Sequence, residues 1–294
     1  MELQAAILGW YDEHARRLAF RSTSDGYAVL VSEVMAQQTQ ISRVDAAWTA
    51  FMAAYPTIAA LADATPGDVL RSWRGLGYNR RALNLGRAAR VVIEEHGGEL
   101  PRDVASLERL PGVGPYTARA VAAIAFGMPV GAVDTNVRRV LARALAGSRD
   151  AYPGREIQAI ADACVPGDRP AVWTHALMDI GATYCRGTAP TCGPCPARPH
   201  CRYAATNGAE EQPKTAIAAR QEPFPATSRW LRGRILDRLR DGGGWVDLDD
   251  TIGQHDQAAI EIALRDLAAE GLLEREADGA LRARLPIANA AAAG

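Results

Sequence analysis

The stretch LPGVGPYTARAV, residues 110–121, indicates how this chain folds. Apolar residues at helical spacing precede it, and an alanine-rich helical pattern runs on from Tyr116 to Phe126. The loop between the two patterns consists of Pro111, Gly112, Val113 and Gly114. Glycines let a backbone turn tightly and approach another backbone closely. The pattern therefore predicts a helix-hairpin-helix unit over residues 107–127.

Such a hairpin has a specific use, because the helix that follows presents free N–H groups at its N-terminus. These groups grip a nucleic-acid phosphate without reading sequence. The alternative, an ordinary turn between two helices, stays open at this point.

Helical periodicity dominates the rest of the chain and strand signals are weak, which predicts an all-α protein. Residues 206–226 are polar and contain proline, as is typical of a linker. Residues 227–287 follow the order helix, turn, helix and small hairpin, which predicts a winged-helix-like module. A degenerate interaction module is an equal alternative for this segment.

The composition is that of a globular protein of about two domains, with 294 residues, 48% apolar and 23% charged. No stretch approaches the ~18 apolar residues of a membrane span, and no signal peptide precedes the first helix. We therefore expect a cytoplasmic protein without membrane contact. The net charge of −1 excludes DNA binding by bulk positive charge. Residues 69–93 nevertheless carry six arginines and no acid, which fits either a phosphate-contacting strip or a solvated helix face.

Four cysteines lie within seventeen residues in the pattern C-x6-C-x2-C-x5-C. They are Cys185, Cys192, Cys195 and Cys201. Zinc and a [4Fe–4S] cluster both accept four thiolates, but zinc sites usually pair two C-x2-C knuckles. The wide outer spacings favour the [4Fe–4S] cluster, which can serve as a structural staple without redox chemistry.

Two carboxylates stand out from apolar surroundings. Asp134, in VDTN (133–136), follows an uncharged approach, and Glu33 lies in SEVMAQQTQ (32–40). Taken alone, Asp134 fits a helix cap and Glu33 a solvated helix face. Taken together, two carboxylates in a cleft suit cleavage of a glycosidic bond, one as the acid and one facing the cationic sugar.

These motifs together resemble the helix-hairpin-helix glycosylases of base excision repair, the endonuclease III superfamily. SEVMAQQTQ and WRGLGYNRRA (73–82) are similar to its adenine DNA glycosylase branch, and the resemblance spans residues 10–205. It implies two lobes with double-stranded DNA between them. The implied parts are a six-helix barrel (25–130) containing the hairpin, an iron–sulfur lobe (131–205) joined by the helix at 1–24, the linker (206–226) and the module (227–287).

The resemblance also implies the catalytic roles. Glu33 matches the acid that protonates the adenine ring, and Asp134 the carboxylate that stabilises the sugar cation or traps it covalently. Asn136 and Arg21 match supporting polar groups. Tyr116 occupies the position of the catalytic lysine of bifunctional relatives.

Further positions match groups that contact DNA or the cofactor. Tyr78 matches a residue wedged into the base stack beside the damaged guanine, and the amides of Gln37 and Gln38 help to offset the cost of unstacking. The four cysteines match the ligands of a [4Fe–4S] cluster. Many bacterial members carry a C-terminal domain that reads 8-oxoguanine; residues 227–287 are too short and too helical for it.

The implied activity is removal of adenine mispaired with 8-oxoguanine or guanine, by a monomeric, nucleoid-associated enzyme. The base is flipped into a pocket. The chain has one lysine, Lys214, in the linker. Strand cleavage needs an amine nucleophile, so we expect a monofunctional enzyme that leaves an abasic site uncut. The alternatives are a T·G mismatch thymine glycosylase, a bifunctional oxidised-pyrimidine enzyme and a non-catalytic iron–sulfur DNA-binding regulator.

Overall fold

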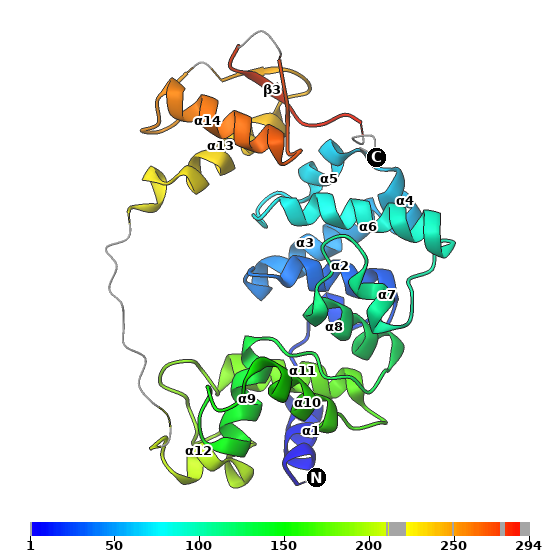
Figure 1. Cartoon of the computed structure of the whole chain (residues 1–294), viewed down its shortest axis with the longest axis vertical. Coiled ribbons are helices and arrows are strands. Elements are labelled where there is room, and N and C mark those ends of the chain that lie inside the picture. The colour runs from blue at the N-terminus through cyan, green and yellow to red at the C-terminus, as the bar shows by residue number, and fades with distance from the viewer. Residues whose placement is uncertain (1, 210, 212–221, 249, 277–279, 289–294) are drawn as a thin grey trace. The chain divides into compact units, whose positions relative to one another are not determined.

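The computed structural model describes residues 2–209, 211, 222–248, 250–276 and 280–288. The chain is mostly helical (Figure 1) and divides into two compact units. The first comprises Met1–Glu33 and Leu100–Ala216, and the second Val34–Glu99 and Ile217–Gly294. Helices dominate both, as predicted. No helix in the described ranges is long and apolar enough to cross a membrane.

The first unit is a helical body. Its helices are α1 (Glu2–His14), η1 (Ala19–Arg21), the first part of α2 (Gly26–Ala36), α7 (Val104–Glu108), α8 (Pro115–Phe126), α9 (Thr135–Ala146), α10 (Gly154–Ala163), α11 (Pro170–Thr183), η2 (Arg198–His200) and α12 (Arg202–Ala205). Helix α11 packs against α1, α8 and α9. Ile7, Tyr11, Val140, Trp173 and Leu177 belong to the core that these contacts bury. The N-terminal helix therefore packs on α11, and Cys185 and Cys195 lie against the same core.

The predicted helix-hairpin-helix is present as α7, a tight turn and α8. Gly112 adopts φ 78°, which favours glycine because it lacks a Cβ. Pro115 occupies the first turn of α8, where its missing N–H costs nothing. The side chains of Leu110 and Val113 are buried. The turn therefore anchors itself through two apolar side chains and leaves backbone at its surface.

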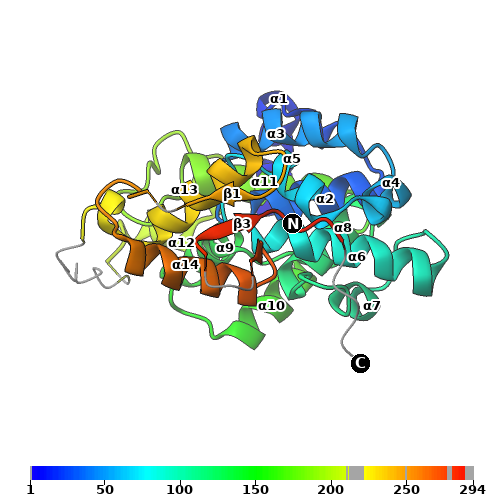
Figure 2. The same cartoon turned by 90° about the horizontal axis from the view of Figure 1, so that it is seen from above.

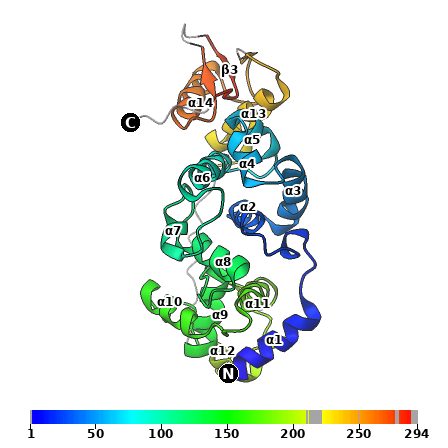
Figure 3. The same cartoon turned by 90° about the vertical axis from the view of Figure 1, so that its right-hand side faces the viewer.

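The second unit begins with the last turn of α2. It contains α3 (Ile41–Ala54), α4 (Ile58–Asp63), α5 (Pro66–Ser72) and α6 (Arg80–His96). Helix α6 packs against α4 and α5 (Figure 3). Thr65 caps α5 by accepting a hydrogen bond from the amide of Asp68 at 3.1 Å. Phe51 and Trp73 pack edge to face in its core, with ring centroids 5.9 Å apart.

The C-terminal module belongs to this second unit. Its elements are η3 (Phe224–Ala226), α13 (Ser228–Asp241), β1 (Val246–Asp247), α14 (Gln257–Ala269), β2 (Glu274–Arg275) and β3 (Arg282–Arg284). The strands form an antiparallel sheet in the order β1-β3-β2, with Val246 opposite Ala283 and Glu274 opposite Arg284. Figure 2 labels β1 and β3 of this sheet together with α13 and α14. Two α-helices, the short helix η3 and three short strands thus make up the described part of the module, and its assignment as winged-helix-like stays a prediction.

Long-range contacts fix the module to helices α5 and α6. The buried Arg240 donates to the carbonyl of Leu70 at 2.9 Å and to Oδ1 of Asn79 at 2.6 Å. The amide of Gly67 donates to the carbonyl of Pro286 at 2.8 Å. A Cβ at Gly67 would lie only 2.6 Å from that oxygen, so the approach requires glycine.

The division into units differs from the predicted lobes. The expected barrel segment 25–130 is split, because Leu100–Ala216 groups with the N-terminal helix while Val34–Glu99 groups with the C-terminal module. These groupings depend on tertiary packing, and composition along the chain carries no signal of it. The functional assignment of the lobes stays a prediction.

Candidate active site

Glu33 is the buried carboxylate of the predicted pair. It lies on α2 and is 7% exposed. Tyr116, in the first turn of α8, donates a hydrogen bond from its hydroxyl to Oε2 of Glu33 at 2.9 Å. The hairpin thus places a hydroxyl donor on an acid that precedes it by 83 residues.

Asp134 is the N-cap of α9, as its position in the sequence suggested. Its Oδ1 accepts hydrogen bonds from the amides of Asn136 at 2.8 Å and Val137 at 2.6 Å. Its Oδ2 accepts a third, from the side-chain amide of Asn136 at 2.8 Å. The helix N-terminus favours the negative charge, and three donors fix the orientation of the carboxylate.

The two acids lie near enough in the first unit for the charge of Asp134 to act on Glu33. Burial raises the pKa of Glu33 to about 7, although the Tyr116 hydrogen bond and the charge of Arg21 oppose the rise and the charge of Asp134 adds to it. Burial and the charges of Glu33 and Asp134 raise the pKa of Tyr116 well above 10, so its hydroxyl stays protonated. Hydrogen bonds thus join Tyr116 to Glu33 and Asn136 to Asp134, and the charge of Asp134 acts on both Glu33 and Tyr116.

The charge of Arg21 acts on Glu33, and the side chain of Arg21 is held by other residues of the first unit. It donates to both oxygens of Asp179, at 2.8 and 2.9 Å, and to the hydroxyl of Tyr11 at 3.3 Å. Asp179 is 1% exposed and also pairs with Arg16. Burial alone would raise the pKa of Asp179, but the hydrogen bonds and charges of the two arginines hold it below its usual value. Asp179 was not predicted as a functional residue. Its position as an acid within the apolar pattern of α11 could have indicated a buried charge with a basic partner.

The remaining predicted DNA-contacting side chains lie in the second unit. Gln38 and Tyr78 have left-handed backbones, with φ 56° and 46°, which is uncommon for residues other than glycine. One guanidinium holds both turns. Arg81 donates to the carbonyls of Gln37 at 2.6 Å and of Gly77 at 3.1 Å. Arg81 is one of the six arginines of the strip at 69–93, but the pattern of the sequence did not indicate that it joins these two turns.

Several arginines of the basic strip at 69–93 form ion pairs or hydrogen bonds within the protein. Arg71 pairs with Asp68 at 2.8 Å and Arg74 with Asp241 at 2.5 Å, while Arg81 binds backbone carbonyls. The hairpin instead offers exposed backbone at Gly112 and Gly114. Arg71, Arg74 and Arg81, three of the six arginines of the strip, therefore have partners within the protein, and the phosphate-contacting strip stays a prediction.

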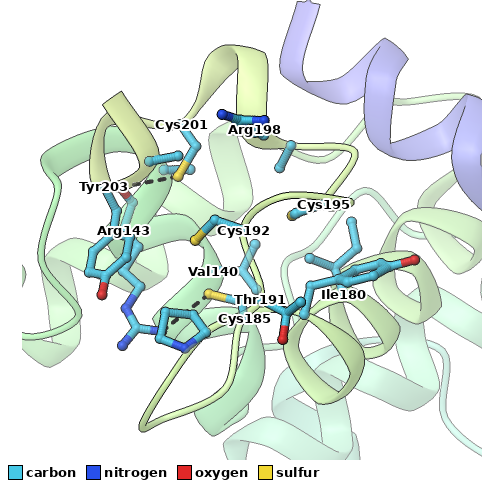
Figure 4. A pocket seen from close by; sticks show the side chains of 15 residues that line it. Val140, Arg143, Ile180, Cys185, Thr191, Cys192, Cys195, Arg198, Cys201 and Tyr203 are labelled. Carbon is cyan, nitrogen blue, oxygen red and sulfur yellow. Dashed lines mark hydrogen bonds between the residues drawn. The ribbon is translucent and has the colours of Figure 1, made fainter. Parts of the chain in front are cut away.

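The four clustered cysteines line one mostly apolar cavity (Figure 4). Its space not filled by atoms, open solvent included, is about 390 Å³. Burial raises the pKa of the Cys195 thiol to about 11, so thiolates here need a cationic group to stabilise them. Within the described ranges, no three His, Cys, Asp or Glu side chains are placed to hold a metal ion. Four thiols around one cavity are the donor set that a polynuclear iron–sulfur group requires.

The buried Arg143 lines this cavity and forms hydrogen bonds to several groups near it. Arg143, 1% exposed, donates to the carbonyl of Arg186 at 2.6 Å and approaches Sγ of Cys185 at 3.5 Å. It also forms two hydrogen bonds to Glu211, at 2.6 and 2.7 Å, and lies 4.6 Å from the ring centroid of Tyr203. Arg143 falls within the apolar periodicity of α9, a signal that the sequence analysis did not use.

Comparison with known proteins identifies the class that this fold and site define. Residues 31–166 match the model of the HhH-GPD superfamily base excision DNA repair proteins. The chain is similar to a thermostable thymine-DNA glycosylase, with a TM-score of 0.65 and 30% identity over 69% of this chain and 95% of that one. It is also similar to an endonuclease III trapped in a covalent intermediate with DNA, with a TM-score of 0.60 and 25% identity over 70% of this chain and 95% of that one.

Sequence relatives narrow the class. The adenine DNA glycosylase of Mycolicibacterium smegmatis is 41% identical over 277 residues, which is 93% of each chain. That of Homo sapiens is 41% identical over 211 residues, 68% of this chain and 39% of the human one. The chain therefore belongs to the adenine DNA glycosylase family of the HhH-GPD superfamily, and the family resemblance inferred from its motifs is confirmed.

Proposed function

We propose that this protein hydrolyses the N-glycosidic bond of adenine mispaired with 8-oxoguanine or guanine in double-stranded DNA. The observation that carries the proposal is the buried Glu33, with a pKa of about 7, coupled to Asp134 at the N-terminus of α9. The names of the sequence relatives support adenine as the released base. The protein acts as a monomer in this proposal.

Glu33 is the general acid. Adenine leaves poorly as an anion, so its ring must gain a proton before the glycosidic bond breaks. A carboxyl with a pKa of about 7 holds that proton near neutral pH, where an ordinary glutamate has lost it. Tyr116 orients the carboxyl through the 2.9 Å hydrogen bond to Oε2.

Asp134 stabilises the sugar cation that forms as the base departs. Its carboxylate is held by the amides of Asn136 and Val137 and needs no reorientation when positive charge develops. The same carboxylate can trap the sugar carbon covalently, after which water releases the sugar. The flipped-out base reaches these groups at an unstacking cost of a few kcal/mol.

DNA contacts fall to the hairpin and to the two turns of the second unit. The exposed backbone of Gly112 and Gly114, before the N-terminus of α8, is suited to a phosphate. Tyr78 is 44% exposed, which suits an aromatic side chain that enters the base stack. Gln37 and Gln38 supply amides near the opened stack.

The four cysteines would hold a [4Fe–4S] cluster. When bound, the group supplies four iron–thiolate bonds that tie the end of α11 to the segment 192–201. Purified protein should show a broad absorption in the blue and about four irons per chain. A colourless protein containing stoichiometric zinc would contradict this assignment.

The decisive experiment is single-turnover base release from a panel of duplexes. Adenine opposite 8-oxoguanine or guanine should be released, whereas thymine opposite guanine and an oxidised pyrimidine should persist. Thymine release is the second candidate, because a solved structure similar to this chain is a thymine-DNA glycosylase. Tight binding without release of any base would identify a non-catalytic DNA-binding protein instead.

The same proposal makes the enzyme monofunctional. Tyr116 offers a hydroxyl where bifunctional relatives have an amine, and the chain's lysine, Lys214, lies outside the described residues. A Schiff base needs an amine, so borohydride should fail to trap the protein on substrate DNA. Efficient trapping under conditions that trap a bifunctional relative would overturn this prediction.

A further inference from the structure

The C-terminal module places an arginine on Tyr78. The guanidinium carbon of Arg229, at the start of α13, lies 4.8 Å from the centroid of the Tyr78 ring. Arg229 is exposed and, among the described residues, has no carboxylate within ion-pair distance. By contrast, Arg232 and Arg234 on the same helix each pair with an acid, at 2.8 and 2.5 Å. The charge of Arg229 is thus available to a ligand.

Tyr78 presents its ring from a backbone conformation that other contacts enforce. A φ of 46° is costly for a residue with a Cβ. Arg81 holds the turn by donating to the carbonyls of Leu76 and Gly77, both at 3.1 Å. The ring nevertheless stays 44% exposed, so the turn exposes an aromatic surface instead of burying it.

The position of Arg229 is fixed by the docking of α13. Near the other end of that helix, Arg240 bonds to Asn79, the residue that follows Tyr78, at 2.6 Å. Arg240 also bonds to Leu70 on α5 at 2.9 Å. The module is therefore anchored to the turn that carries Tyr78, and Arg229 is part of the same surface.

We propose that Arg229 and Tyr78 form one DNA-reading pair, in which Arg229 donates a hydrogen bond to O6 of the guanine or 8-oxoguanine opposite the adenine. The proposal rests on the proposed function. Aromatic rings stack on bases, and a guanidinium over such a ring keeps its N–H donors in its own plane. Guanine and 8-oxoguanine both keep O6 as an acceptor, whereas cytosine presents a donor in the major groove. The hydrogen bond from Arg229 therefore distinguishes guanine and 8-oxoguanine from cytosine.

The test measures binding to duplexes that carry a non-hydrolysable adenosine opposite 8-oxoguanine, guanine or cytosine. Arg229→Ala should weaken binding roughly 10-fold opposite the two purines and less than about 2-fold opposite cytosine. Arg229→Lys keeps the charge and N–H donors that can reach O6, so it should retain part of the purine preference. Arg238→Ala is the matched control, because Arg238 is exposed and lies about two and a half turns further along α13.

Equal loss opposite all three bases would identify a phosphate contact and overturn the proposal. Unchanged binding in Arg229→Ala would also overturn it. Since the adenosine is not hydrolysed, these outcomes do not depend on catalysis. Adenine release by the unaltered protein, measured in parallel, tests the proposed function separately. Combining Tyr78→Ala with Arg229→Ala should cost less than the sum of the single changes if the two side chains act together.

Discussion

Glu33 is an acid at neutral pH because of where α2 places it. The rate of adenine release should therefore fall as the pH rises through about 7, close to tenfold per pH unit above that value, because the deprotonated carboxylate has no proton to give. Single-turnover rates between pH 6 and pH 9 measure this. A profile that stays flat over that interval would contradict the role of Glu33 as the acid.

Stability gives an independent readout of the same group. The folded-state pKa is raised from 4.5 to about 7, so the contribution of Glu33 is fully present below pH 4.5 and is lost as the pH rises to about 7. The loss is on the order of 3 kcal/mol in the free energy of unfolding. Urea unfolding at pH 5 and pH 8 should show it in the unaltered protein and not in Glu33→Gln.

Asp134 combines a structural and a chemical role, and Asp134→Asn separates them. Asparagine caps helices about as well as aspartate, so the variant should unfold at nearly the same denaturant concentration. Removing the negative charge should lower single-turnover release by roughly 100-fold or more. Binding to the mismatched duplex should persist. Loss of binding together with release would contradict a role confined to charge stabilisation.

At the level of elements, the close approach of α9 and α11 positions Asp134. A Cβ at Gly181 would lie 2.4 Å from Cβ of Asn136 and 3.0 Å from its Cα. Gly181→Ala should therefore destabilise the protein by about 1–3 kcal/mol and slow adenine release, since α9 must move. The measurements are denaturant unfolding and single-turnover rates.

Gly233→Ala is the control for that substitution. Gly233 lies on α13, with nothing within 4 Å of the position its Cβ would take. Alanine there should stabilise the helix by about 0.5–1 kcal/mol without changing base release. Similar effects of the two substitutions would show that the contact between α9 and α11 does not position the site.

Elements defined by local chemistry were predictable from the sequence, and those defined by distant partners were not. The caps at Thr65 and Asp134 and the turn at Gly112 follow from rules that span a few residues. The hydrogen bond between Tyr116 and Glu33 joins residues that are 83 positions apart in the sequence. The hydrogen bond between Arg240 and Asn79 joins residues that are 161 positions apart. The resemblance of the motifs to a known family predicted that Tyr116 and Glu33 belong to one site. No local pattern of the sequence predicted that Arg240 contacts Asn79.

At the level of the whole molecule, the buried Arg240 is one of the residues that anchor the C-terminal module. Arg240→Ala should lower the free energy of unfolding by about 1–3 kcal/mol, because the carbonyl of Leu70 and the side-chain oxygen Oδ1 of Asn79 lose their hydrogen-bond donor. It should also weaken binding to mismatched DNA, since Tyr78 is the neighbour of Asn79. Denaturant unfolding and duplex affinity are the measurements.

The exposed Arg238, two residues earlier on the same helix, is the control for that change. Arg238→Ala should leave both quantities within about 0.5 kcal/mol of the unaltered protein. If Arg240→Ala were equally silent, the hydrogen bonds to Leu70 and Asn79 would not be what anchors the module.

Because each compact unit is assembled from two stretches of the polypeptide, biosynthesis imposes an order on folding. The first 33 residues leave the ribosome long before Leu100–Ala216 exist to complete their unit. Ile7 and Tyr11 on α1 must remain without their partners on α11 until that later stretch has been translated. The nascent chain cannot finish its N-terminal unit first, as sequentially arranged domains do. The apolar side chains of α1 therefore stay uncovered through much of synthesis, a period in which a chaperone that binds apolar segments can act on the chain.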